Sequence, residues 1–325
     1  MDRRGFSRLV LAGCLGGPLA AVGQTSSRIP RIGCLLPGND QATDDFHRRE
    51  VLDPLRQFGW VEGKNFVAVV RFGNGPDMPR LAQELVALRV DLIVSGGTNA
   101  TLAAKAATNT IPIVMDAASD PVGMGLVASL AHPGGNVTGY SLVTPDLIVK
   151  RAAILREIVP NLRRIAVVLG ASPVFSFLRK DFKAAYQRLG IDEIEVETTS
   201  EQVLMDGIAD AGRRGAQGLE FGVAGTPGWD ERAIQVATQA HMPVLTASRQ
   251  MIEAGALIYL SSDNADQHQR VAAIIDRILK KGAKPADIPV EQASRFPMII
   301  NLRAAQALRL IVPRSVILRA DEVIR

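Results

Sequence analysis

Short runs of apolar residues alternate with amphipathic segments along most of the chain. Short runs that are almost entirely apolar, such as 90–94 with Asp91 as the one polar residue, are typical of strands buried on both faces of a parallel sheet. Segments such as 78–88 instead place apolar side chains at helical spacing. The first half is predicted to contain strands at 32–36, 66–71, 90–94 and 111–115, and helices at 44–58, 78–88, 99–107 and 122–130.

The second half repeats this alternation. Thr144 and Pro145 are typical of a helix start, with Thr as the N-cap and Pro at the first helical position. A long helix is predicted at 266–280, and a strand and a helix follow at 297–301 and 302–310. Regular alternation of this kind predicts parallel sheets covered by helices on both faces.

The two halves also resemble each other in sequence. The run RIGCLLP at 31–37 is answered about 133 residues later by RIAVVLG at 164–170. We therefore predict an α/β fold of two doubly wound parallel-sheet lobes joined by a hinge, with a ligand cleft between them. The N-terminal lobe is predicted at 28–139 and the C-terminal lobe at 140–263. Part of 264–325 is expected to return to the first lobe.

Polar residues follow the predicted strands, where parallel α/β sheets bind ligands. Free N–H groups and the helix dipole at such helix starts favour an anion such as a carboxylate. An ammonium group could be held by a carboxylate from the same set. The alternative is structural, since Thr98 and Asp120 are also good N-caps. The candidate ligand-binding residues are Asn39, Ser95, Gly97, Thr98, Asp116, Ser119, Asp120, Ser172, Ala224, Ser248 and Asp263.

Composition and motifs exclude several classes of function. The net charge of +4 and the 5% aromatic content give no support to nucleic-acid binding. No phosphate loop, metal-ligand spacing or catalytic motif stands out, so we expect no cofactor, no metal and no enzymatic activity. His47 and His268 are expected on exposed helix faces, and Cys34 is expected to be a buried filler. An enzyme using Asp116 and Asp120, or a ligand-presenting sensory module, remain the alternatives.

The first residues have the character of an export signal. Arg3 and Arg4 precede an uncharged stretch that is too short to span a bilayer, and small residues lead to a cleavage site near Gly23. The protein is therefore predicted to be periplasmic, exported through a signal at 1–23 of the twin-arginine-like or general type. The alternative is a lipoprotein anchored through Cys14.

Several motifs occur in order over nearly the whole mature chain: GWVEGKN at 59–65, DPVG at 120–123, PGGNVTG at 133–139 and GAKPADIPVEQ at 282–292. In these the chain resembles the tryptophan-binding-protein-like family of ABC-transporter substrate-binding proteins. The resemblance implies a type I periplasmic-binding fold and a receptor that delivers a small ligand, an amino acid or other carboxylate, to a membrane permease. It points to Gly97, Thr98 and Asp120 as pocket residues. The second lobe departs, since Ala224-Gly225-Thr226 stands where the family often carries Pro-Asp.

Overall fold

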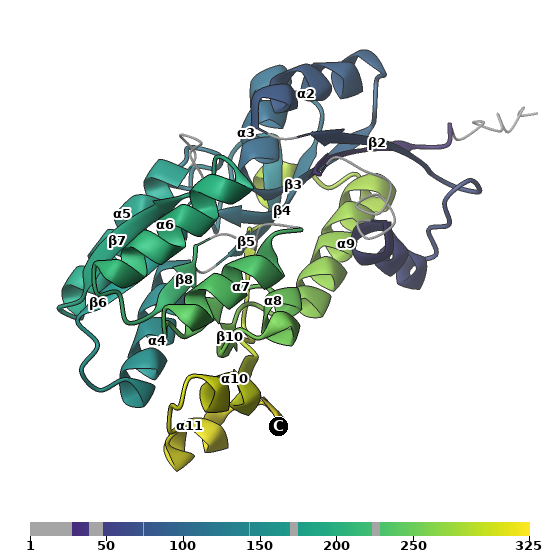
Figure 1. Ribbon diagram of the computed structural model, residues 1–325. Helices are drawn as coiled ribbons and strands as arrows, with labels where there is room; N and C mark the ends of the chain where they lie inside the picture. The colour runs from purple at the N-terminus through teal and green to yellow at the C-terminus, as the bar shows by residue number, and fades with distance from the viewer. Residues whose placement is uncertain (1–27, 39–47, 74, 143, 170–174, 223–227) are drawn as a thin grey trace, which may run out of the picture.

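The computed structural model describes residues 28–38, 48–73, 75–142, 144–169, 175–222 and 228–325. They form two sheets with helices on both faces, one sheet in each half of the molecule (Figure 1). The predicted signal at 1–23, with Cys14, lies outside the described residues, as does His47.

The first sheet has the strand order β11-β5-β4-β3-β1-β2, and all its printed pairings are parallel. Its last strand comes from far along the chain, because β11 pairs with β5. The strands are β1 (Arg31–Pro37), β2 (Val67–Gly73), β3 (Leu92–Gly96), β4 (Ile113–Ser119), β5 (Val137–Leu142) and β11 (Glu291–Gln292).

Helices cover both faces of this sheet because successive side chains of a strand point in opposite directions. Cys34 in β1 is buried, as predicted, on the face covered by η1 (Arg48–Leu52), η2 (Asp53–Phe58) and α9 (Asn264–Lys281). The next residue, Leu35, belongs to the core on the opposite face, under α2 (Met78–Ala87) and α3 (Gly97–Ala107).

The second sheet has the order β13-β12-β10-β9-β8-β6-β7, and only the β10–β12 pair is antiparallel among its printed pairings. One face carries α4, α5, α10 and α11, and the other carries α6, α7 and α8. The strands are β6 (Arg164–Leu169), β7 (Asp192–Glu197), β8 (Leu219–Phe221), β9 (Val244–Thr246), β10 (Ile258–Leu260), β12 (Met298–Asn301) and β13 (Glu322–Ile324). The helices are α4 (Thr144–Ile158), α5 (Phe175–Arg188), α6 (Glu201–Arg213), α7 (Asp230–Gln239), α8 (Arg249–Ala254), α10 (Leu302–Ala307) and α11 (Arg314–Arg319). Two short 3₁₀ turns lie elsewhere in the chain: η3 (Gly75–Asp77) precedes α2, and η4 (Pro285–Asp287) precedes β11.

Two predicted helices of the first half take other forms. In the segment predicted as a helix at 44–58, the described residues form a π-helical turn followed by a 3₁₀ helix with Pro54 near its start. Residues 122–130 form successive turns and no helix, because Gly125 adopts a left-handed conformation (φ 65°) only four residues after Pro121.

The chain passes between the sheets three times. It leaves the first sheet after β5, returns through residues 261–263 into α9, and leaves again between β11 and β12 at 293–297. Helix α9 therefore packs on the first sheet, whereas β12 and β13 complete the second. Three segments of the chain therefore connect the two sheets.

Candidate functional site

The carboxyl ends of β3 and β4 lie side by side at one edge of the first sheet. The parallel register pairs Ser95 with Met115 and Gly96 with Asp116. Beyond this point the register shifts between Met115 and Ala118, where Ala117 has a positive φ of 64°. A β-bulge of this kind bends a strand locally, and bulges are common beside functional sites.

Thr98 joins the two strand ends. Its Oγ1 atom accepts a hydrogen bond from the Ser119 amide at 3.0 Å. Gly97, the first residue of α3, has a φ of 77°, and a side chain at this position would meet open space. Gly96 occupies the N-cap position and α3 has no side-chain cap, so Thr98 is not the N-cap that the structural alternative predicted. Within the part of the chain that the structure describes, no side chain caps the first N–H groups of α3.

Ser95 is directed into the core instead. It is fully buried, and its Oγ atom lies 2.9 Å from the Thr101 hydroxyl. Thr101 donates its own proton to the Gly97 carbonyl at 2.8 Å, which makes Ser95 the donor to Thr101. The Ser95 hydroxyl thus holds β3 against α3, and we no longer assign it to the ligand.

Asp116 has partners from α9 on both carboxylate oxygens. Gln267 donates to Oδ1 at 2.5 Å, and the Nε2 atom of His268 lies 3.5 Å from Oδ2. On the other side of the ring, His268 Nδ1 lies 3.1 Å from Glu50 Oε2 in η1, without the geometry of a hydrogen bond. Asp116 is therefore a tether between the sheet and α9.

The burial of His268 corrects our expectation of an exposed helix face, since only 7% of the residue is exposed. Burial by itself lowers the pKa of His268, but the hydrogen bond and charge of Asp116 and the charge of Glu50 outweigh it, so the pKa is raised above 6.5. The sequence did carry a signal. His268 stands three and seven residues before the buried Val271 and Ile275, on the apolar stripe of α9.

Asp120 is exposed, directly follows β4 and has a left-handed conformation with a φ of 38°. Its Oδ1 atom accepts from the Gly123 amide at 2.9 Å, so it closes a turn rather than capping the predicted helix. Its negative charge affects a carboxyl group of the second lobe. The pKa of Asp181 in α5 is raised, first by burial and then by the negative charge of Asp120.

Two candidates after strands of the second sheet cap helices. Ser248 accepts from the Met251 amide at the start of α8. Asp263 accepts from Ala265 and Asp266 at the start of α9, and its carboxylate lies 4.0 Å from Arg295 in the third connection. Three further candidates, Asn39, Ser172 and Ala224, fall outside the described residues.

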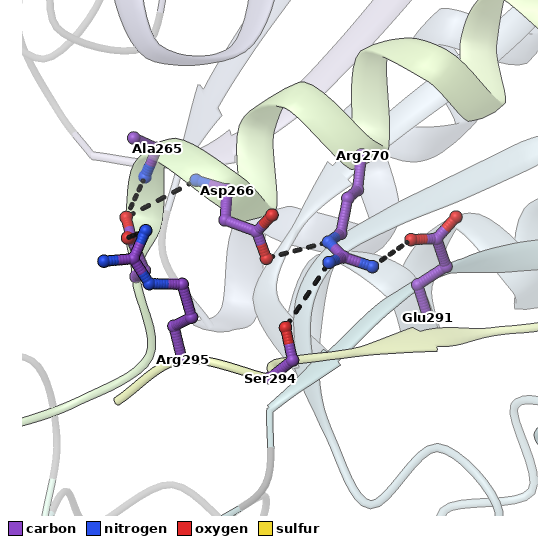
Figure 2. Close-up of polar contacts among 7 residues, drawn as sticks. Ala265, Asp266, Arg270, Glu291, Ser294 and Arg295 are labelled. Carbon is purple, nitrogen blue, oxygen red and sulfur yellow. Dashed lines mark hydrogen bonds and ion pairs between the residues drawn. The ribbon is translucent and has the colours of Figure 1, made fainter. Parts of the chain in front are cut away.

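The second and third connections between the sheets are tied together beside the start of α9 (Figure 2). The Asp263 amide donates to the Arg295 carbonyl at 3.2 Å. Arg270 of α9 donates to Asp266 at 2.7 Å, to Glu291 of β11 at 2.9 Å and to Ser294 at 3.4 Å. One guanidinium group thus joins α9 to the strand that continues into the third connection.

Two cavities are lined by none of the candidate ligand-binding residues. One, of about 280 Å³, opens between η1, η2 and α9 and is lined by Glu50 and His268. The other, of about 800 Å³, lies at the amino ends of β6 and β7 and is lined by Arg164 and Glu193. Within the described ranges, no cluster of His, Cys, Asp and Glu side chains is suited to a metal, and no helix is long and apolar enough to cross a bilayer.

Comparison with known proteins decides the family. The model of the ABC transporter substrate binding protein family matches residues 45–324. The chain belongs to this family of ABC transporter substrate-binding proteins. Its two mainly parallel sheets have the type I periplasmic-binding architecture of solved transport proteins, which confirms the predicted fold class.

Relatives of this substrate-binding protein include amino-acid binders. A tyrosine-binding protein from Clostridioides difficile (strain R20291) is 28% identical over 281 residues, which make up 84% of this chain and 77% of that protein. A crystal structure of an ABC domain from Streptococcus pneumonia in complex with L-Trp has a TM-score of 0.81 and 26% identity, covering 91% of this chain and 99% of that one. The ligand-free, open structure of a substrate-binding protein with adhesive properties from Clostridium difficile has a TM-score of 0.65 and 25% identity, with coverage of 91% and 99%.

Proposed function

We propose that the protein is the extracytoplasmic solute receptor of an ABC importer, and that it closes its two lobes on an aromatic amino acid and delivers it to a membrane permease. A signal at 1–23 would export it to the periplasm, with anchoring through Cys14 as the alternative. The names of two relatives support an aromatic amino acid as the ligand.

The observation that carries the proposal is the start of α3. This helix of 11 residues begins at the carboxyl end of β3 without a side-chain cap. Its first N–H groups and its dipole suit a carboxylate, and the Thr98 hydroxyl stands beside them. By contrast, the starts of α8 and α9 are already capped by Ser248 and Asp263. We therefore assign the ligand carboxylate to Gly97 and Thr98.

An ammonium group has a counterpart in Asp120 and Asp181. These carboxylates belong to opposite lobes, and Asp120 is close enough to raise the pKa of Asp181. A positive charge between them would offset their mutual repulsion and so favour the closed arrangement. This pair supplies negative charge although Ala224-Gly225-Thr226 lacks the carboxylate that the family often carries.

Closure agrees with the comparisons. The protein is more similar to the L-Trp complex (TM-score 0.81) than to the open, ligand-free structure (0.65), although the sequence identities are nearly equal at 26% and 25%. A binding role without catalysis agrees with the carboxylates of the first lobe, because Asp116 is tethered to α9 and Asp120 closes a turn.

Calorimetry on the exported chain tests the proposal. L-tryptophan and L-tyrosine should bind, whereas tryptamine, which lacks the carboxylate, and indole-3-propionate, which lacks the ammonium group, should each bind at least about tenfold more weakly, because one buried charge-assisted contact is lost. Asp181→Asn should weaken L-tryptophan and leave indole-3-propionate nearly unchanged. Absence of binding by both amino acids would overturn the ligand class, and equal binding of tryptamine would overturn the assignment of the carboxylate to α3.

A further inference from the structure

The end of β4 is held from behind by the first turns of α9. Asp116 lies at the β-bulge, and the next residue, Ala117, has a positive φ that a non-glycine residue adopts only under constraint. Ser119, whose amide binds Thr98, stands three residues beyond Asp116. Whatever holds the Asp116 carboxylate therefore also holds the strand end that completes the proposed ligand site.

Gln267 and His268 supply this hold. They contact different oxygens of Asp116, and all three residues are more than nine-tenths buried. The two α9 residues follow within a few positions of the second connection, which ends at Asp263. A movement of this connection would act on Gln267 and His268 directly.

The His268 ring lies between two carboxylates on separate elements. Asp116 approaches Nε2 from β4, and Glu50 approaches Nδ1 from the π-helical turn η1. A protonated ring would attract both, whereas a neutral ring can donate from one nitrogen only. The charge on His268 therefore decides whether its ring attracts the carboxylates of both β4 and η1 or donates to only one of them.

We propose that Gln267 and His268 are positioning residues that keep the bulged end of β4 in its ligand-binding arrangement, and that protonation of His268 makes ligand affinity depend on pH. This inference rests on the proposed function, since it concerns the regulation of the same site. It adds a group that does not touch the ligand and acts through Asp116.

The surrounding charges favour a protonated ring. Beyond Asp116 and Glu50, the neighbouring elements contribute Arg49 of η1 and Asp53 of η2 to the cavity that His268 lines. Strand β5 contributes Tyr140, whose pKa is raised to about 12, mainly by burial, so that it stays neutral. The raised pKa of His268 agrees with this balance.

The direction of the effect follows from linkage. Because the folded-state pKa of His268 is raised above 6.5, the stabilisation is complete below pH 6.5 and is lost as the pH rises through the folded-state value. Affinity for the ligand should therefore be highest near pH 5.5 and should fall on the alkaline side.

The test compares His268→Gln with the wild type and with His132→Gln, a matched change at an exposed position of the same lobe. L-tryptophan affinity, measured by calorimetry from pH 5.5 to 8.5, should fall at least about fivefold in the wild type and in His132→Gln, the lower end of usual coupling between sites. His268→Gln should lose this fall in affinity towards alkaline pH. Glu50→Gln should move the midpoint to lower pH, because the ring loses one negative neighbour. Equal pH profiles for His268→Gln and the wild type would overturn the proposal.

A ligand-free measurement separates this inference from the ligand assignment. If L-tryptophan does not bind, hydrogen exchange of the amides of 113–119 is compared between His268→Gln and the wild type at the same acidic pH. Faster exchange in the variant supports the positioning role even though the ligand class has failed. Unchanged exchange overturns it. If His268→Gln does not fold, Glu50→Gln takes its place in both measurements, and an unshifted wild-type profile overturns the proposal.

Discussion

A buried ion pair joins helix α4 to strand β8 in the second lobe, and its loss should destabilise that lobe. Arg151 of α4 contacts Glu220 of β8 with an Nε–Oε1 distance of 2.5 Å, and the two side chains are 5% and 0% exposed. Arg151 also donates to the Leu260 carbonyl at 2.9 Å, and the Tyr186 hydroxyl donates to Glu220. Burial, and then the charge of Glu220, keep the pKa of Tyr186 well above its ordinary range, so it remains a donor.

Glu220→Gln keeps the volume of the side chain and one acceptor but removes the negative charge. Breaking a buried ion pair by removing one partner destabilises by about 3–5 kcal/mol, because the other charge stays buried. Since Gln can still accept one bond from Arg151, we expect a loss of about 3 kcal/mol in the free energy of unfolding of the second lobe.

Urea unfolding can be followed separately in each lobe, because the chain has one tryptophan in each: Trp60 packs in the first and Trp229 in the second. In a Trp60→Phe background, the fluorescence of Trp229 reports the second lobe. The triple variant Arg151→Met, Glu220→Leu, Tyr186→Phe removes every side-chain member of the cluster and should lose less than Glu220→Gln alone. A loss below about 1 kcal/mol for Glu220→Gln, or a larger loss in the triple variant, would refute this reasoning.

Three further predictions concern the ligand edge, the outer sheet edge and the hinge. Thr98→Val keeps the side-chain shape but removes the oxygen that accepts from the Ser119 amide. The variant should therefore lose about 1 kcal/mol in the free energy of unfolding and bind L-tryptophan more weakly. An unchanged free energy in urea unfolding and an unchanged affinity in calorimetry would contradict a role for this hydrogen bond. Burial, and then the charge of Glu195, raise the pKa of Glu193 from 4.5 to about 7, so its contribution to stability is complete below pH 4.5 and is lost as the pH rises through 7. Glu193→Gln should therefore gain melting temperature relative to the wild type between pH 5 and 8, and a constant difference across that range would count against it. Arg270→Lys replaces the three-nitrogen guanidinium with a single ammonium group, so it cannot keep the contacts with Asp266, Glu291 and Ser294 at once. The ligand-free variant should therefore have a larger radius of gyration in small-angle scattering. An unchanged radius would show that these contacts do not hold the lobes together.

Local conformation explains where the sequence-based prediction of helices was wrong. Residues 122–130 have apolar side chains at helical spacing, but Asp120 closes a turn onto Gly123 and Gly125 is left-handed. Periodicity counts apolar positions and does not register these backbone conformations. Most apolar residues of the segment 48–58 are buried, but the segment forms a π-helical turn, which is wider than an α-helix, followed by a 3₁₀ helix, which is tighter.

The sequence by itself determined the two-lobed α/β architecture and the edge where polar residues gather. A strand buried on both faces must be continuously apolar, and such runs are visible without any knowledge of their neighbours. Repetition of the pattern at 31–37 and 164–170 then indicated two lobes, and the motifs from 59–65 to 282–292 indicated the family.

Only the tertiary structure decided what each candidate side chain does. Asp116 was a candidate for holding a ligand, yet it is bound by Gln267, 151 residues away, and Ser95 is directed into the core. His268 was expected at the surface and is buried against two carboxylates. The physical reason is that the partner of a polar group depends on how distant segments pack, whereas periodicity along the chain reports only which face of its own element a residue occupies.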